Sequence, residues 1–295
     1  MELFTGSGVA LITPFDENGD VNYSRLREIL EFHVINHTDA IIVTGTTGEG
    51  STLSDEEKIS VIEFTVDIIN SRIPVIVGTG SNDTRHAVEF SKRVEKLGVD
   101  GLLVVTPYYN KGNENGIYEH YKAIAEGVKI PVILYNVPSR TGVNLSIPLL
   151  KRLAQIENIT ALKEASGNIS YVAEVAREVP ELDIYSGNDD MVVPVLSLGG
   201  KGVISVSANI IPDISHDMTA SFLKGDVKKA RELQLKYNDL VNALFLETNP
   251  VPVKEAMNFL GYEVGNCRLP LGAMNESNRA RLTDILTAHE VTGWK

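Results

Sequence analysis

The feature of this chain that most constrains its fold is a series of short, almost continuously apolar segments that recur along it. Eight such segments lie at residues 9–12, 40–43, 74–77, 101–105, 131–134, 160–162, 183–185 and 202–206. A parallel strand that is covered on both faces needs this continuous hydrophobicity, whereas a half-exposed antiparallel strand alternates between apolar and polar residues. The pattern therefore predicts eight buried, parallel strands.

Amphipathic, charge-rich stretches separate the apolar segments and predict the helical crossovers that parallel strands require. They lie at residues 24–33, 55–69, 84–97, 117–128, 147–155 and 171–179. Ser54 stands before three acidic residues and is expected to cap the second helix. Because the β/α units follow one another without a break in composition, a closed (β/α)8 TIM barrel is favoured over the alternative, a doubly wound sheet.

The strand signal stops after about residue 224, and the rest of the chain has helical patterns at 227–246, 253–260 and 277–290. We therefore expect residues 1–224 to form a (β/α)8 catalytic barrel and residues 225–295 to form a C-terminal helical extension. Both parts belong to the α/β class of folds.

Charge and cysteine content limit the kinds of partner. The net charge is −12, which argues against nucleic acid, because phosphate binding needs clustered lysine and arginine. The one cysteine allows no intrachain disulfide and fits a reducing cytoplasm. No basic and apolar leader or stretch of roughly 20 apolar residues is evident, so we expect neither export nor a membrane span. Small molecules are the expected ligands.

A lysine directly follows the sixth apolar segment. Barrel enzymes carry their active sites at the carboxyl ends of the strands, so Lys163 is expected at a barrel mouth where water is scarce. Desolvation disfavours the ammonium and lowers its pKa, which supplies the neutral amine that attacks a ketone to form an imine. The alternative is a structural lysine that pairs with Glu164 or reaches the surface.

Other polar side chains follow neighbouring segments and fit imine chemistry. The hydroxyls of Tyr135, Thr46 and Tyr109 can relay protons to and from a substrate, although each alone can be an ordinary rim side chain. The glycine-flanked pair Thr46 and Thr47 offers hydroxyls and backbone N–H groups to a carboxylate. Arg140 can bind a second carboxylate bidentately, or it can lie on the surface.

Metal sites receive little support. His33 and His37 have the spacing of some zinc ligands, but no third ligand is evident, so solvated histidines are expected. Asp189 and Asp190 are adjacent carboxylates, and we expect them to cap a following helix. No metal and no cofactor are therefore predicted.

Several strings in the chain together resemble the dihydrodipicolinate synthase family of the N-acetylneuraminate lyase superfamily. They are Gly-Thr-Thr-Gly-Glu at 45–49, Thr-Pro-Tyr-Tyr at 106–109, Leu-Tyr-Asn-Val-Pro-Ser-Arg-Thr-Gly at 134–142, Leu-Lys-Glu-Ala at 162–165, Gly-Val-Ile-Ser-Val at 202–206 and Asn-Pro-Val-Pro-Val-Lys at 249–254. The resemblance covers essentially the whole chain. The first and third strings are typical of the synthases and not of the sugar-acid lyases.

The resemblance implies a reaction. Lys163 would form an imine with pyruvate, and the enamine would add to L-aspartate 4-semialdehyde. The product would be 4-hydroxy-tetrahydrodipicolinate, on the route to lysine and diaminopimelate. Thr46, Tyr135 and Tyr109 would form the proton relay, with Tyr109 contributed by a neighbouring subunit. At least a homodimer follows, and family members are usually homotetramers built as dimers of dimers.

The resemblance also implies binding residues. Thr46 and Thr47 would hold the carboxylate of pyruvate, and Arg140 would hold that of the aldehyde. Gly187 and Ile204 would line the pocket through their backbone carbonyls.

Feedback inhibition by lysine is expected to be weak or absent. The residues that form the lysine pocket of inhibited family members align here with Gly50, Ser51, Asp55, Lys58 and His86. Asn82 and Tyr108 match that pocket. A cationic ligand would lose its glutamate and meet Lys58 instead.

Three competing functions stay open on the sequence. One is a pyruvate lyase that acts on a sugar acid, which Arg140 argues against. Another is a barrel that uses a flavin or a phosphorylated sugar, supported by the glycines at 78–81. The last is a catalytically silent scaffold, which would not need Lys163, Tyr135 and Thr46 together.

Overall fold

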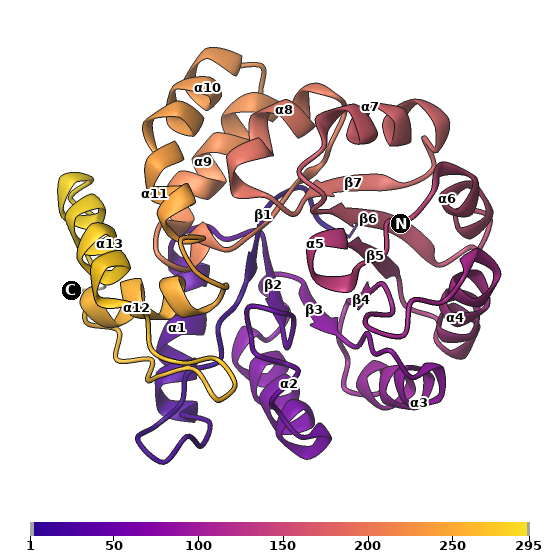
Figure 1. Ribbon diagram of the computed structural model, residues 1–295, viewed down its shortest axis with the longest axis horizontal. Helices are drawn as coiled ribbons and strands as arrows, with labels where there is room; N and C mark the ends of the chain where they lie inside the picture. Colours follow the sequence, from indigo (N-terminus) through magenta and orange to yellow (C-terminus); the bar gives the residue numbers. More distant parts are fainter. Residues whose placement is uncertain (1–2, 294–295) are drawn as a thin grey trace.

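In the computed structural model, which describes residues 3–293, eight parallel strands close into a barrel in the order β1 to β8 (Figure 1). The strand β8 pairs with β1, and this pairing closes the ring. The strands are β1 (Gly6–Ala10), β2 (Ala40–Val43), β3 (Val75–Gly78), β4 (Gly101–Val105), β5 (Val132–Asn136), β6 (Ile159–Glu164), β7 (Asp183–Ser186) and β8 (Gly202–Ser205). The predicted (β/α)8 class is confirmed, and the doubly wound alternative is wrong.

The strands β5 and β6 extend further than the apolar segments that predicted them. Their ladder continues through the pairs Tyr135↔Lys163 and Asn136↔Glu164. Polar side chains are tolerated there because backbone hydrogen bonds, and not hydrophobicity, define a strand. Tyr135 and Lys163 therefore lie inside strands, whereas the sequence pattern had placed both just beyond a strand end.

The helices surround the barrel on the outside, apart from the short helix Pro138–Thr141, which lies over the ring (Figure 1). They are α1 (Tyr23–Ile35), α2 (Asp55–Ile69), α3 (Thr84–Glu95), α4 (Glu114–Gly127), α5 (Pro138–Thr141), α6 (Ile147–Leu153), α7 (Ile169–Glu178), α8 (Val192–Ser197), α9 (Pro212–Leu223), α10 (Val227–Lys236), α11 (Asn238–Ala243), α12 (Val251–Phe259) and α13 (Glu276–Ala288), with short 3-10 turns η1 (Asp189–Met191) and η2 (Ser207–Asn209). The helix α2 has the predicted bounds.

The sequence pattern missed or merged some helices. The short helices α5 and α8, and the longer α9, were not predicted. Their proline and apolar content hides the helical period. The single helix expected over residues 227–246 is two helices, α10 and α11, which meet at Tyr237. No glycine or proline marks that break.

Two apolar layers hold the barrel together. The outer layer lies between strands and helices and includes Leu162 and Leu134. The inner layer fills the barrel with side chains of the alternate residues, among them Ala161, Ile133 and Tyr135. Because successive strand residues point to opposite faces, Lys163 shares the inward direction of Ala161.

The C-terminal helices pack beside the N-terminal part of the ring. The helix α13 contacts α11 and α12, and Tyr262 stacks edge-on against Phe32 of α1. Figure 1 shows α12 and α13 outside α1. Residues 1–2 and 294–295, which the expected barrel and extension include, lie outside the described residues. Across the part of the chain that is described, no helix has the length and apolar character to cross a bilayer.

Candidate active site

Lys163 lies in the interior of the barrel near its carboxyl end. It occupies β6 and is paired in register with Tyr135 of β5 and with Tyr185 of β7. Its Nζ atom is 4.4 Å from the centre of the Tyr135 ring. The side chain is 6% exposed, so the alternative of a lysine that reaches the surface is wrong.

The surroundings of Lys163 favour its neutral form. Burial lowers the pKa of this amine from 10.5 to about 8. The negative charge of Asp189 opposes the shift, and the positive charge of Arg140 adds to it. Glu164 does not pair with Lys163, because its carboxylate accepts from Asn136 Nδ2 at 2.7 Å and from the backbone of Ser166. An appreciable fraction of neutral amine is therefore present near neutral pH.

Tyr135 stands beside this amine as a protonated phenol. Burial raises the pKa of Tyr135, while the charge of Arg140 and a side-chain hydrogen bond with Thr46 partly offset the effect. The hydroxyls of Tyr135 and Thr46 thus lie within reach of each other, as a proton relay requires.

The loop between β2 and α2 brings Thr46 and Thr47 to the mouth of the barrel. Thr46 lines a cavity of about 360 Å³, together with Tyr135 and Arg140. Thr47 is 3% exposed, and its Oγ1 accepts from Asn249 Nδ2 at 3.0 Å. Thr46 and the phenol of Tyr135 therefore face the same cavity, while Thr47 lies buried beside it, and its contact with a substrate stays a prediction.

Arg140 lies on α5, which directly follows β5 across the mouth. Its Nη2 donates to the backbone oxygen of Asn249 at 2.9 Å, and its side chain lines the same cavity. The guanidinium keeps further donors for a ligand. Arg140 is exposed, so it does lie on the surface, but it is anchored to Asn249 and faces the cavity, and its role in binding a carboxylate stays a prediction.

Tyr109 lies apart from the other residues of the predicted relay. Its side chain is 88% exposed, and its backbone has a φ of 74°. Its neighbour Tyr108 lines the cavity. A left-handed, exposed tyrosine next to the site fits a residue that acts on another subunit, and this role stays a prediction.

Gly187 and Ile204 lie around the barrel interior without lining the described cavity. Ile204 on β8 is fully buried in the inner layer. Gly187 follows β7, and its backbone N–H donates to the backbone oxygen of Glu164 at 2.7 Å. A Cβ at this position would come 2.6 Å from the Cβ of Ala165, so a larger residue would force the strand ends apart. Their substrate contacts stay predictions.

Two expectations about polar residues are wrong. Asp189 does not cap a helix. Its carboxylate accepts from Ser205 Oγ, from Ser207 Oγ at 2.8 Å and from the N–H of Val206 at 2.9 Å. His33 is not solvated, because it is fully buried, with its Nδ1 2.9 Å from Thr38 Oγ1. Among residues 3–293, no three His, Cys, Asp or Glu side chains gather as metal ligands.

The sequence reasoning also missed a role for Asn249. This residue contacts Thr47 through its side chain and Arg140 through its backbone. The string at 249–254 is part of the resemblance, but Asn249 lies far along the chain from Thr47 and Arg140, so the sequence does not reveal these contacts. The string Asn-Pro-Val-Pro at 249–252, an asparagine followed by two closely spaced prolines, was the available signal.

Fold and site together define the class of the protein. A closed (β/α)8 barrel carries a buried lysine of lowered pKa at the carboxyl ends of its strands, where barrel enzymes have their active sites. The chain is therefore an enzyme of the (β/α)8-barrel class.

Comparisons with known proteins identify the family. The model of the dihydrodipicolinate synthetase family matches residues 3–289. A 4-hydroxy-tetrahydrodipicolinate synthase of Caldicellulosiruptor bescii is 56% identical over 99% of both chains. The dihydrodipicolinate synthase structure of Aquifex aeolicus has a TM-score of 0.96 at 44% identity, and it covers 99% of this chain and 100% of its own.

A third relative was solved with a ligand. The chloride-inhibited dihydrodipicolinate synthase of Acinetobacter baumannii, complexed with pyruvate, has a TM-score of 0.95 at 42% identity and covers 97% of this chain and 99% of its own. The chain belongs to the dihydrodipicolinate synthetase family, which confirms the resemblance noted in the sequence.

Proposed function

We propose that the chain condenses pyruvate with L-aspartate 4-semialdehyde to give 4-hydroxy-tetrahydrodipicolinate, as a cytoplasmic enzyme of lysine and diaminopimelate biosynthesis. The observation that carries this proposal is the buried amine of Lys163, whose pKa is about 8, next to the Tyr135 phenol. The names of the relatives support the overall reaction, and the pyruvate complex of the Acinetobacter baumannii enzyme supports the first substrate.

In the first half of the proposed reaction, the neutral Lys163 amine attacks the keto carbon of pyruvate. Water leaves and an imine forms, with Tyr135 and Thr46 passing protons to the departing oxygen. Loss of a proton from the methyl carbon gives an enamine. Thr46 and Thr47 hold the carboxylate of pyruvate through their hydroxyls and the adjoining backbone, which fixes the keto carbon near the amine.

In the second half, the nucleophilic carbon of the enamine forms a bond to the aldehyde carbon, and the aldehyde oxygen takes up a proton. Arg140 orients this substrate by its carboxylate. The amino group of the substrate then attacks the imine carbon and displaces Lys163. The ring closes, and the free amine of Lys163 is regenerated without a net change in oxidation state.

Borohydride reduction in the presence of pyruvate tests this proposal. Peptide mapping of wild-type protein is expected to locate the reduced adduct on Lys163, and the Lys163→Ala variant is expected to form none. An adduct on another lysine, or full turnover by Lys163→Ala, would refute the assignment. A panel of aldehydes separates the synthase from a sugar-acid lyase, because only the synthase should prefer L-aspartate 4-semialdehyde.

Weak or absent feedback by lysine is part of the proposal. Lys58 lies next to the described cavity, with its Nζ 3.3 Å from the Asp55 carboxylate and 5.1 Å from the centre of the Phe90 ring. An incoming ammonium group would be repelled there. Turnover measured against increasing L-lysine should fall little, whereas inhibition as strong as that of a lysine-sensitive family member would contradict the proposal.

A further inference from the structure

The loop of residues 44–52, named here the threonine loop, has a conformation that its own sequence does not favour. Thr44 and Glu49 adopt left-handed backbone conformations, with φ of 53° and 54°. Residues other than glycine avoid this region, and such conformations persist only where surrounding contacts enforce them. The loop carries Thr46 and Thr47, so whatever enforces its shape also sets the position of both hydroxyls.

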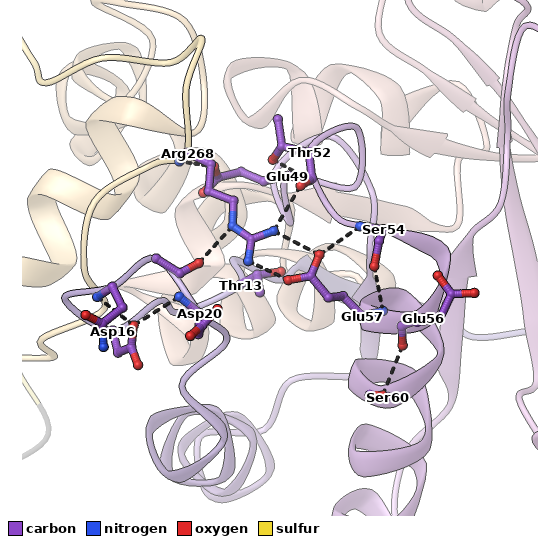
Figure 2. A network of polar contacts seen from close by, with 12 residues as sticks. Thr13, Asp16, Asp20, Glu49, Thr52, Ser54, Glu56, Glu57, Ser60 and Arg268 are labelled. Atoms are coloured by element: carbon purple, nitrogen blue, oxygen red, sulfur yellow. Dashed lines mark hydrogen bonds and ion pairs between the residues drawn. The ribbon is translucent and has the colours of Figure 1, made fainter.

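Glu49 attaches the threonine loop to a distant part of the chain. Its side chain is fully buried, and its Oε1 accepts from Lys254 Nζ at 2.9 Å. Its Oε2 accepts from the backbone N–H of Arg268 at 2.8 Å. Figure 2 shows Glu49 beside Arg268, whose guanidinium also reaches Thr52 and Glu57. The carboxylate of Glu49 therefore holds the threonine loop against residues 249–268, named here the C-terminal segment.

Lys254 uses all its donors for this attachment. Its Nζ donates to Glu49 Oε1 and to the backbone oxygens of Thr13 and Asn266, both at 3.0 Å. The residue is 2% exposed. An ammonium has three donors, so none is left for a substrate. This buried lysine thus differs from Lys163, whose Nζ has no such set of acceptors among residues 3–293.

The same segment touches the site at a second point. Asn249 stands two residues before the first residue of α12, the helix that carries Lys254. It donates to Thr47 Oγ1 and accepts from Arg140. The threonine loop is therefore attached to the C-terminal segment at two points, Thr47 and Glu49, on either side of Gly48.

We propose that Lys254 is a positioning residue of the active site: its buried ion pair with Glu49 holds the threonine loop so that Thr46 and Thr47 meet the keto acid. This inference rests on the proposed function, in which these two threonines bind pyruvate. It gives the proposed C-terminal extension, residues 225–295, a role in the chemistry of the barrel.

Steady-state kinetics of two variants test the inference. Lys254→Met removes the ammonium at similar volume, and the KM for pyruvate should rise by about tenfold, because misplaced binding groups lose much of their effect. The KM for the aldehyde should change less than about twofold, because the Arg140 contact with Asn249 is kept. Borohydride trapping on Lys163 at saturating pyruvate should stay complete, since β6 is untouched.

The double variant Lys254→Met/Glu49→Gln guards against misfolding. It leaves no unpaired buried charge, so it should fold even where the single variant does not. Its KM for pyruvate should also rise by about tenfold, because methionine cannot donate to the amide. Leu153→Ala on α6, which opens a cavity in the outer layer far from the loop, is the matched control. It should lower the Tm and leave both KM values unchanged.

The outcomes separate the two proposals. A folded double variant whose KM for pyruvate stays within about twofold of wild type would overturn the positioning role. An equal rise of both KM values, also seen in Leu153→Ala, would overturn it as well, because it would reflect general destabilisation. Failure of wild-type protein to form a pyruvate adduct on Lys163 would instead overturn the proposed function.

Discussion

At the scale of single residues, the two buried lysines should affect stability in opposite directions. Within residues 3–293 no carboxylate forms an ion pair with Lys163, and burial lowers its pKa from 10.5 to about 8 despite the charge of Asp189, a difference worth about 3 kcal/mol. Below pH 8 the folded state must bury an ammonium, so Lys163→Met should increase the free energy of unfolding by up to about 3 kcal/mol. Lys254→Met should decrease the free energy of unfolding by about 3–5 kcal/mol, because it leaves the buried Glu49 carboxylate without its cation.

The stability difference between Lys163→Met and wild type should depend on pH, in a direction that follows from the lowered pKa of Lys163. Between pH 8 and 10.5 the unfolded chain binds more protons at this group than the folded protein does, so wild-type stability rises with pH. The advantage of Lys163→Met should therefore shrink as pH rises and vanish near 10.5. Chemical denaturation of both proteins at several pH values measures this difference. An advantage that is constant across that range would contradict the lowered pKa.

Arg140 should influence both substrates, through separate effects. Its charge helps to lower the pKa of Lys163, so Arg140→Gln should raise that pKa and move the midpoint of imine formation to higher pH. Loss of a charged hydrogen bond to the aldehyde should also raise the KM for that substrate by about 10- to 100-fold. Arg152→Gln, which removes an exposed guanidinium over the Tyr118 ring, is the control and should change neither quantity. An unmoved midpoint would argue against electrostatic coupling.

At the scale of elements, the first turn of α2 contains a capping box. Ser54 Oγ accepts from the N–H of Glu57, and the Glu57 carboxylate accepts from the N–H of Ser54. Ser54→Ala should therefore decrease the free energy of unfolding by about 1 kcal/mol. Glu63→Ala in the same helix is the control, because that side chain is exposed and lies beyond the first turn, so its loss should be close to neutral. Equal losses in denaturant titrations would refute a specific cap.

The strands and helices show which parts of the fold and of the site the sequence could predict and which it could not. The strands and α2 were predicted because continuous apolar runs and a capping serine act locally. The break at Tyr237 was not, since no local residue type requires it. Lys163 and Tyr135 were found because strand ends mark the site in a barrel. Asn249 and Lys254 were not given roles, because their partners lie about two hundred residues away and only the folded chain brings them together.

At the scale of the whole molecule, the exposed Tyr109 predicts that a complete site needs two chains. Tyr109 is 88% exposed in the chain, while Tyr135 and Thr46 line the cavity without it. If Tyr109 acts on the neighbouring subunit, Tyr109→Phe and Lys163→Ala homomers should both have little activity. In a mixed dimer, the Lys163-bearing site receives an intact tyrosine from its partner and is restored.

Co-expression of the two variants measures this restoration. Random pairing makes about half of the dimers mixed, each with one complete site, so about a quarter of wild-type activity should return. Mixing Lys163→Ala with Tyr135→Phe is the control. Both of those residues belong to one chain's own barrel, and each mixed site then lacks one of them, so no activity should return. Recovery in neither mixture would show that Tyr109 does not act on the neighbouring subunit, because a tyrosine acting within its own chain cannot complement a partner.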